Sequence, residues 1–419
     1  MLDVRQNKVR PYALEGNFGL EREALRVTGE GRMAHTPHPF PDSPRIVRDF
    51  CENQTEINTG VHPDAAAAVA ELTTLNAEIL RTLAGREYLW PFSNPPFIAD
   101  AADVMPAKFD GEQSSKGAYR DYLAAKYGRY LMTFCGIHVN FSFGERLVAA
   151  AAGGDGRAFR DRLYLHVAEQ MVLWGWIVVP LTAASPLLDA SYLHKGRKGG
   201  EDFLGLASVR CSEFGYWNQF APINDFSSVE AYAHAIRDSV RRGYIAAPSE
   251  LYFPIRLKPR GANSLSTLVE SGVDHIEVRC VDLNPLVGGL ADWRDIFFIQ
   301  LLLLWCAARP AARLTAKHQL QAVQNFKNAA RYDIDLPNIV LPDGTAESVR
   351  RSGIGLLAEM RRFFADFPPA VLETLDFERN KLENPECRPA VQVRERFGGL
   401  FAVKGLDWAR QLTEAALHV

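Results

Sequence analysis

His-Ile-Glu-Val-Arg-Cys-Val-Asp-Leu-Asn-Pro, residues 275–285, carries the clearest strand pattern in this chain. Side chains alternate between the two faces of a strand, so Ile276 and Val278 can be buried on one face. Glu277 and Arg279 then share the opposite face. On a single strand such charges usually face water. The same pattern recurs on several other strands, which favours a sheet with one packed face and one polar, cleft-forming face.

Residues 19–27, Gly-Leu-Glu-Arg-Glu-Ala-Leu-Arg-Val, show this arrangement with two acids. As a strand, the segment places Glu21 and Glu23 on one face, about 7 Å apart by the rise per residue. Carboxylates this close repel each other unless a cation lies between them. A second acidic segment, residues 49–59, adds Asp49, Glu52 and Glu56. We therefore expect a cluster of acids on the polar face.

Three further segments are expected to add polar groups to the same face. Residues 136–143, Gly-Ile-His-Val-Asn-Phe-Ser-Phe, alternate so that His138 and Asn140 share one side of a strand. Three cations come from the other two segments, residues 208–218 and 250–258: Arg210, Arg256 and Lys258. Taken singly, each residue has an ordinary structural explanation, since a lone histidine is usually a satisfied structural residue.

Composition excludes several classes of protein. Lys and Arg number 47 against 50 Asp and Glu, which leaves a net charge of −3 and no electrostatic case for nucleic acid. The longest apolar runs, residues 171–181 and 296–308, are shorter than the ~20 residues that span a bilayer and predict buried helices. The N-terminus has no apolar signal region, and the six cysteines show no CxxC pair. We expect a cytoplasmic protein with reduced thiols, no zinc and no membrane partner.

The chain shows no internal repeat and no long linker, so a single catalytic domain over residues 1–419 is the simplest organisation. Residues 64–81 predict an amphipathic helix that begins at Pro63-Asp64. The mixed core is expected over 15–310. Residues 311–419 predict a helical C-terminal part, with helices over 311–331, 346–367, 370–382 and from 389 to the end, which braces the sheet. The fold class expected is α+β.

The collected side chains predict a chemistry. Many carboxylates without cysteine pairs suit a hard cation, chiefly Mg²⁺, which binds carboxylates together with substrate phosphates. The sequence contains neither GxxxxGK[ST] nor a GxGxxG that follows a strand, so the common phosphate-binding loops are unsupported. Phosphate is then expected to be held by metal ions and arginines.

Six ordered motifs resemble bacterial glutamate–cysteine ligase, also called γ-glutamylcysteine synthetase. They are Gly-Leu-Glu-Arg-Glu-x-Leu-Arg-Val (19–27), Asp-Phe-x-Glu-x-x-x-Glu (49–56), Gly-Ile-His-x-Asn (136–140), Ser-Val-Arg-x-Ser-x-x-Gly-Tyr (208–216), Glu-Leu-Tyr-x-Pro-Ile-Arg (250–256) and Ile-Glu-Val-Arg-x-x-Asp-Leu-Asn-Pro (276–285). The resemblance covers about residues 15–310. It is to the ligase half of the bifunctional glutathione-synthesis proteins without their second half, so a γ-glutamyl dipeptide is the expected product.

The resemblance implies a glutamine-synthetase-like fold, in which an antiparallel sheet is bent into a saddle or funnel with helices packed outside. It also implies a reaction. The γ-carboxylate of glutamate attacks the γ-phosphate of ATP, and the amine of cysteine then displaces phosphate from the γ-glutamyl phosphate. The partners implied are therefore the small molecules ATP, glutamate and cysteine, with Mg²⁺ as the metal, for which Mn²⁺ can substitute.

The resemblance also implies roles for individual residues. The metal ligands would be Glu21, Glu23, Asp49, Glu56, His138 and Glu277. The catalytic residues would be Arg279, Arg210 and Glu277, with Arg279 stabilising the phosphoryl transition state. ATP would be bound by Arg256, Lys258 and Arg279. The amino-acid substrates would be bound by Phe50, Tyr119, Leu123, Met132, Asn140, Arg210 and Tyr216.

Three positions depart from the family pattern. Met132 stands where relatives usually carry glutamine, Cys135 replaces a small residue and Val139 lies where an aromatic residue is frequent. A methionine makes the acceptor pocket less polar and more adaptable. The acceptor is therefore cysteine or a small apolar amino acid such as 2-aminobutyrate or propargylglycine, between which one pocket residue discriminates by only about 1–3 kcal/mol.

Two other classes of function share parts of this pattern. A phosphotransferase of the guanidino-kinase type needs the same metals and arginines but stops at phosphoryl transfer. A binding protein without turnover would keep the cleft, although it has little use for a transition-state arginine beside Glu277. Peptide formation with release of ADP and phosphate distinguishes the ligase from both.

Overall fold

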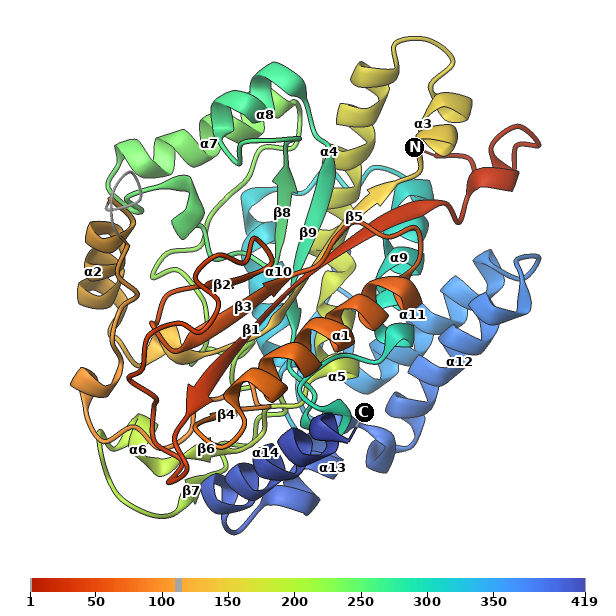
Figure 1. Ribbon diagram of the computed structural model, residues 1–419. Helices are drawn as coiled ribbons and strands as arrows, with labels where there is room; N and C mark the ends of the chain where they lie inside the picture. Colours follow the sequence, from red (N-terminus) through yellow and green to blue (C-terminus); the bar gives the residue numbers. More distant parts are fainter. Residues whose placement is uncertain (1, 110–114, 419) are drawn as a thin grey trace.

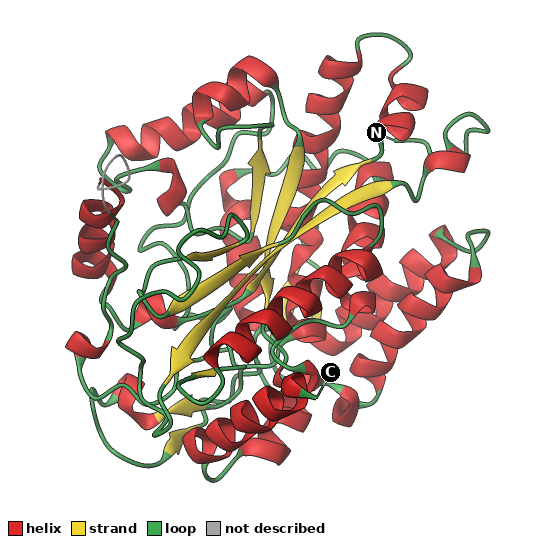
Figure 2. Ribbon diagram, in the orientation of Figure 1, coloured by secondary structure: helices red, strands yellow, loops and turns green. Residues whose placement is uncertain are grey.

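The computed structural model of the protein describes residues 2–109 and 115–418, and its core is a seven-stranded antiparallel sheet. Six strands lie in the order β2-β3-β1-β5-β9-β8, and β4 pairs with β1. Their bounds are Gly16–Val27 (β1), Ile46–Arg48 (β2), Gln54–Asn58 (β3), Tyr88–Leu89 (β4), Ile137–Phe143 (β5), Ile255–Lys258 (β8) and His275–Val281 (β9). The strands change direction strongly from β1 to β8, with helices around them (Figures 1 and 2). The α+β prediction is confirmed.

Strand β1 lies at the centre of this sheet and sets the register of the polar face. Glu21 lies opposite His138 of β5, and Glu23 lies opposite Glu56 of β3. Between them Arg22 points to the other face, where it is fully buried. Because side chains alternate, the acids that were predicted to share a face become neighbours across three adjacent strands.

On the sheet's other two strands the same geometry brings cations to the acids. In β9 the residue opposite Asn140 of β5 is Glu277, and the residue opposite Glu277 in β8 is Arg256. The apolar residues Ile276 and Val278 of β9 are fully buried as expected, and Glu277 between them is fully buried as well, beneath the charged groups of the opposite face. The cross-strand pairs therefore place Arg256, on the edge strand β8, beside the carboxylate of Glu277.

Buried helices cover the sheet. Helices α1 (Ala65–Leu83), α4 (Gly156–Trp174) and α5 (Val178–Thr182) contact the strands directly, and α9 (Trp293–Ala308) packs against α1 and α4. As predicted, α1 begins after Asp64, whose side chain accepts a hydrogen bond of 2.8 Å from the Ala67 amide. The run Gly156–Thr182 is long and apolar enough to cross a membrane, but 83% of its most apolar window is buried inside the protein.

Further elements surround the cleft and the edges of the sheet. They are α2 (Ser115–Tyr127), α3 (Glu145–Ala152), α6 (Ala190–Leu193), α7 (Val229–Arg241), α8 (Leu265–Ser271), and the short strands β6 (Leu188–Asp189) and β7 (Glu201–Asp202). Figure 1 shows α2 at the periphery, on the side of β2 and β3, well away from the helices that cover the sheet. This helix becomes important for the cavity described below.

The C-terminal part is mostly helical, as predicted, but differs at three points, one of which is that residues 398–400 interrupt the helix expected from residue 389 to the end. Its elements are α10 (Ala316–Ala329), β10 (Asn338–Val340), β11 (Ala346–Ser348), α11 (Val349–Phe363), α12 (Pro369–Glu383), α13 (Pro389–Phe397) and α14 (Phe401–Leu417). The first helix begins only after Thr315, whose hydroxyl caps it. Residues 338–348 form a hairpin, because a turn at Gly344 joins two short strands before α11 begins.

This part braces the helices more than the sheet. Helix α12 packs on α9 and α14 packs on α1, while contact with the sheet runs through β4. A buried ion-pair triad joins α12 to α9: the ammonium of Lys381 binds Asp295 and lies 2.9 Å from Glu378 Oε2. The tail therefore touches the sheet directly at β4, and elsewhere supports it through the intervening helices.

Candidate active site

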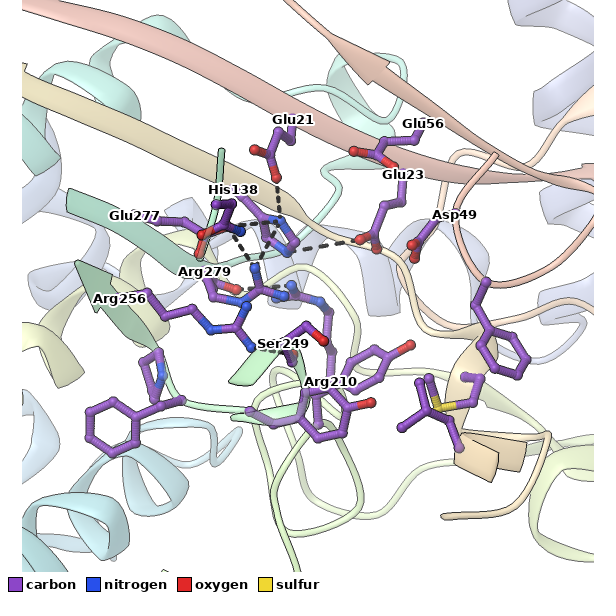
Figure 3. A pocket seen from close by; sticks show the side chains of 18 of the residues that line it. Glu21, Glu23, Asp49, Glu56, His138, Arg210, Ser249, Arg256, Glu277 and Arg279 are labelled. Carbon is purple, nitrogen blue, oxygen red and sulfur yellow. Dashed lines mark hydrogen bonds and ion pairs between the residues drawn. The ribbon is translucent and has the colours of Figure 1, made fainter. Parts of the chain in front are cut away.

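A cavity of about 710 Å³ opens on the polar face of the sheet. It brings together residues that are up to 259 positions apart in the sequence, from Glu21 on β1 to Cys280 on β9. The sequence-predicted residues that line it are Glu21, Glu23, Asp49, Phe50, Glu56, Tyr119, Leu123, Met132, His138, Arg210, Tyr216, Arg256, Lys258, Glu277 and Arg279. Figure 3 shows Glu21, Glu23, Asp49 and Glu56 along one side of this space and the three arginines along the other, with Glu277 beside Arg279.

Glu277 is the centre of the charged network. Its side chain is almost completely buried, and Oε1 accepts a hydrogen bond of 2.6 Å from Arg279 Nη1. Lys258 Nζ lies 3.4 Å from the other carboxylate oxygen. Burial alone would raise the pKa of Glu277, but Arg279, Lys258 and Arg256 together outweigh it and hold the pKa well below its ordinary value. Glu277 is therefore ionised.

His138 lies between Glu277 and two acids of β1. Its Nδ1 atom is 3.1 Å from Glu21 Oε2 and 3.7 Å from Glu277 Oε1, and its Nε2 atom is 3.9 Å from Glu23 Oε1. Burial, with the nearby charge of Arg279, lowers the pKa of His138 to about 4. The imidazole is therefore neutral near pH 7, which is the form that binds metal ions.

Asn140 contributes to this cluster indirectly. It was predicted to bind substrate, but it is not among the described residues that line the cavity. Its side-chain amide instead donates a hydrogen bond of 3.0 Å to Glu21 Oε1, while His138 holds Oε2. Burial would raise the pKa of Glu21, but the hydrogen bond with His138 helps to hold it below the ordinary value. Asn140 thus orients a carboxylate that faces the cavity.

A second cluster consists of Glu23, Asp49 and Glu56, around which the positive charge is too small to offset the effect of burial on their pKa values. Burial raises the pKa of Glu23, Asp49 and Glu56, and their mutual repulsion adds to the shift for Glu23 and Glu56. The pKa of Glu56 reaches about 8. Three crowded carboxylates of this kind are stabilised as anions when a divalent cation binds between them.

The donor set fits Mg²⁺. Glu21, His138 and Glu277 each offer a ligand atom, and these atoms all lie within 4.8 Å of one another. Together with the second cluster they provide five carboxylates and one imidazole around a single cavity. Oxygen-rich donors with room for water and phosphate are typical of Mg²⁺ and Mn²⁺ sites.

Arg210 is held rigidly at the end of the cavity. Its Nη2 atom donates a hydrogen bond of 2.9 Å to the carbonyl of Arg279, so that one arginine supports the strand that carries the other. Gly136 leaves the space that its guanidinium fills, since a Cβ there would lie 2.1 Å from Arg210 Cζ. Arg256 is similarly fixed, with Nε and Nη2 each 2.9 Å from the carbonyls of Leu251 and Ser249.

The remaining wall of the cavity is apolar and aromatic. Phe50, Leu123 and Met132 are each at most 5% exposed and all line the space. Tyr216 also lines it, and its ring centroid lies 5.4 Å from that of Tyr252. One part of the cavity is therefore suited to a small apolar group, while the other part carries the charges.

Several lining residues were missed from the sequence: Arg48, Phe109, Arg120, Trp217, Ser249, Tyr252, Phe253 and Asn263. Tyr252 and Phe253 lie inside the motif at 250–256 and Arg120 follows Tyr119, so proximity in sequence was an available signal for these. Glu52 was wrongly expected to face the cleft. It lies in the turn between β2 and β3, where strand alternation ends, and pairs with Arg48 at 3.0 Å.

An antiparallel sheet with a carboxylate-rich cavity on its polar face defines the class as glutamine-synthetase-like. A glutamate–cysteine ligase of Francisella tularensis in complex with AMP superposes with a TM-score of 0.86 at 23% identity, covering 96% of this chain and 89% of that one. A bifunctional glutathione synthetase of Pasteurella multocida superposes with a TM-score of 0.84 at 25% identity, covering 99% of this chain and 54% of the other.

Sequence comparison identifies the family. Residues 2–246 and 242–329 match the family described as Glutamate-cysteine ligase. A glutathione biosynthesis bifunctional protein of Listeria innocua is 33% identical over 94% of this chain and 54% of its own length. A glutamate–cysteine ligase of Clostridium acetobutylicum is 30% identical over 74% of this chain and 77% of its own. This chain belongs to the glutamate–cysteine ligase family, and it spans about half the length of the bifunctional relatives it matches.

Proposed function

We propose that the protein is an ATP-dependent ligase that joins the γ-carboxylate of L-glutamate to the amine of L-cysteine through a γ-glutamyl phosphate. The observation that carries this proposal is the buried Glu277–Arg279 pair, 2.6 Å apart, beside a cluster of crowded acids in one cavity. A cavity that only bound an amino acid would have no need to hold a cationic guanidinium against five carboxylates. Phosphoryl transfer needs both kinds of group: carboxylates to hold the metal ions, and a guanidinium to neutralise and orient the transferring phosphoryl group.

The acids would hold the metal ions. Glu21, Glu23, Asp49, Glu56, His138 and Glu277 are the proposed ligands, and bound Mg²⁺, or Mn²⁺ in its place, would neutralise charge on the phosphates of ATP. Asn140 holds Oε1 of Glu21 by its hydrogen bond, and His138 lies against Oε2. The neutral state of His138 leaves an imidazole lone pair free for a ligand role.

The arginine side of the cavity would bind the nucleotide. Arg256, Lys258 and Arg279 come from the adjacent strands β8 and β9 and face the same space. Burial and the charge of Arg279 lower the pKa of Arg256 only to about 10, so it stays cationic at neutral pH. AMP is bound by the Francisella relative, which supports a nucleotide site in this fold. We assign Arg279 to the transition state because it bonds Glu277 with one nitrogen and retains further donors for a phosphoryl oxygen.

The other side would bind the amino acids. Arg210 and Tyr216 line the junction between the charged and apolar regions and would contact the substrate carboxylates. The acceptor side chain would lie against Phe50, Tyr119, Leu123 and Met132. Because Met132 is a buried, flexible thioether in this wall, a small apolar amino acid is the second candidate acceptor. A cytoplasmic setting is consistent with six free cysteines, five of which are buried.

The test is ADP release from purified protein with ATP, Mg²⁺ and glutamate across a panel of acceptors. The panel contains cysteine, 2-aminobutyrate and propargylglycine, and the product is identified by mass. A cysteine-dependent release of ADP with a γ-glutamylcysteine mass supports the first assignment, and preference for an apolar acceptor supports the second. Glutamate-dependent ADP release without any dipeptide would favour simple phosphotransfer, and no turnover at all would refute the ligase proposal.

A further inference from the structure

Glu250 is a fully buried carboxylate outside the cavity that binds four donors. Oε1 accepts hydrogen bonds from Lys126 Nζ at 2.5 Å, Tyr127 OH at 2.7 Å and Tyr122 OH at 3.5 Å. Oε2 accepts a hydrogen bond of 2.6 Å from the Ala246 amide. A buried carboxylate is costly unless its charge is neutralised and its lone pairs are used. Here one oxygen is devoted almost entirely to the end of helix α2.

Helix α2 supplies a wall of the cavity. Tyr119, Arg120 and Leu123 all line it, and they alternate along the helix with the three donors that bind Glu250. Arg120 reaches across to β2–β3, where it donates to the carbonyl of Asp49. Tyr119 receives a hydrogen bond of 3.0 Å from Ser249, the residue before Glu250. The helix therefore depends on Glu250 and its neighbour for its position on one side of the cavity.

The same short segment is held from the opposite direction by cavity residues of β8. Arg256 donates to the carbonyls of Ser249 and Leu251, on either side of Glu250. Asn218 donates a hydrogen bond of 2.7 Å to the Glu250 carbonyl and accepts one of 2.8 Å from the Tyr252 amide. The turn at 248–252 thus connects the proposed nucleotide side of the cavity with the helix that forms the amino-acid side.

We infer that Glu250 is a positioning residue that sets the affinity for the acceptor amino acid without touching it. It holds α2 through Tyr122, Lys126 and Tyr127, and so fixes the distance between the wall at Tyr119 and Leu123 and the wall at Met132. This inference rests on the proposed function of the cavity. Loss of the clamp lets α2 move outward, which weakens contact with the acceptor but leaves the strands that hold ATP and metal in place.

The test compares Glu250→Gln with Glu87→Gln. Glu87 is also a buried carboxylate, 4% exposed and bound to Arg26 at 2.7 Å, but it is not among the described residues that line the cavity and makes no contact with α2. Hydrogen exchange of the unliganded proteins is measured on residues 115–127 and on β5. Steady-state kinetics then give KM for the acceptor, KM for ATP and kcat. Tyr127→Phe removes one of the hydrogen bonds to Glu250, together with the one of 3.0 Å that the Tyr127 hydroxyl accepts from Asn218, and serves as a milder second variant.

Glu250→Gln should accelerate exchange in residues 115–127 and raise KM for the acceptor about tenfold, the loss expected from one charge-assisted hydrogen bond. Tyr127→Phe should shift both quantities in the same direction by less. In both variants, KM for ATP, kcat and exchange in β5 should stay near their original values. In Glu87→Gln, exchange in residues 115–127 and KM for the acceptor should stay unchanged as well. Unchanged exchange in residues 115–127, or an equal rise of both KM values, would overturn the inference. If the unmodified protein turns over no acceptor, the proposed function fails, and the exchange measurement alone decides about the clamp.

Discussion

The guanidinium of Arg210 lies against the backbone of Gly136, so close that a Cβ on residue 136 would be 2.1 Å from Arg210 Cζ. Side-chain carbons do not approach this closely, so only glycine leaves room for the arginine. We expect Gly136→Ala to displace Arg210 and to lower kcat/KM about 10²-fold, the cost of an ångström-scale misplacement at a reacting centre. Gly29→Ala, at a position where a Cβ would meet nothing within 4 Å, should leave kcat/KM unchanged.

Replacement of Arg279 even by lysine, which keeps the positive charge, should impair catalysis. Its planar fork bonds Glu277 and retains donors that face the cavity, whereas an ammonium is a point charge. We expect Arg279→Lys to lower kcat by at least about 10³-fold with a much smaller change in KM for glutamate, as for other transition-state arginines. The measurement is single-turnover formation of product. A partly exposed arginine paired with Asp292 away from the cavity gives the control, because Arg294→Lys should leave kcat unaltered. Equal effects of the two variants would contradict the assignment.

Stability without metal should fall as pH rises from about 6.5 to 8. The pKa of Glu56 is about 8 in the fold against an ordinary value of 4.5, so in this range the folded state binds more protons than the unfolded state. Stability therefore decreases with pH. His138 contributes little here, because its lowered pKa affects stability only below its ordinary value of 6.5.

Thermal unfolding in EDTA and in MgCl₂ tests this dependence. Tm in EDTA should fall between pH 6.5 and 8, and Glu56→Gln should flatten the decline. Mg²⁺ should raise Tm more at pH 8 than at pH 6.5, since it binds the deprotonated acids. A pH-independent Tm in EDTA would show that the three acids are not coupled in the way described.

Met132 should influence the choice of acceptor. It lies in the apolar wall with Phe50 and Leu123, where an amide would add polar surface. We expect Met132→Gln to lower kcat/KM for 2-aminobutyrate relative to cysteine by about tenfold, within the 1–3 kcal/mol available to a single pocket contact. Competition between the two acceptors in one reaction, read by product mass, measures this ratio directly. An unchanged ratio would place the acceptor side chain elsewhere in the cavity.

The triad between α9 and α12 should be important for stability. Lys381→Met leaves Asp295 and Glu378 buried without their cation, and breaking a buried pair in this way costs about 3–5 kcal/mol. Urea unfolding followed by circular dichroism gives the change. Arg379→Met, on the same helix but in an exposed pair with Glu383, should cost no more than about 0.5 kcal/mol. Similar losses in both variants would argue against a stabilising triad.

Alternation along strands explains why much of the cavity was predictable. Glu21, Glu23, Glu277 and Arg279 each lie within a strand whose apolar partners are buried, so the local pattern already separates the two faces. Antiparallel pairing then brings such faces together. Glu52 shows the limit of this reasoning, because it lies in the turn just outside β3, where neighbouring side chains no longer alternate.

Contacts between distant segments could not be predicted in the same way. Glu250 belongs to a recognisable motif, but its partners Lys126 and Tyr127 lie 124 and 123 residues earlier, on a helix where only Tyr119 and Leu123 were predicted as site residues. Asn140 has the right face, yet only the position of Glu21 shows that its amide is used within the cluster. Such contacts depend on where whole elements pack, which a local pattern does not contain.

The pairing register of strand β1 links the stability of the fold to the composition of the cavity. A slip of one residue against β3 and β5 would turn Arg22 into the cavity and send Glu21 and Glu23 into the apolar layer, because the side-chain period is two. Buried carboxylates without partners would then destabilise the misaligned chain by several kcal/mol each. Misregistered molecules are therefore eliminated by their own instability. The register in which the chain is stable is therefore the same register that places Glu21 and Glu23 in the cavity.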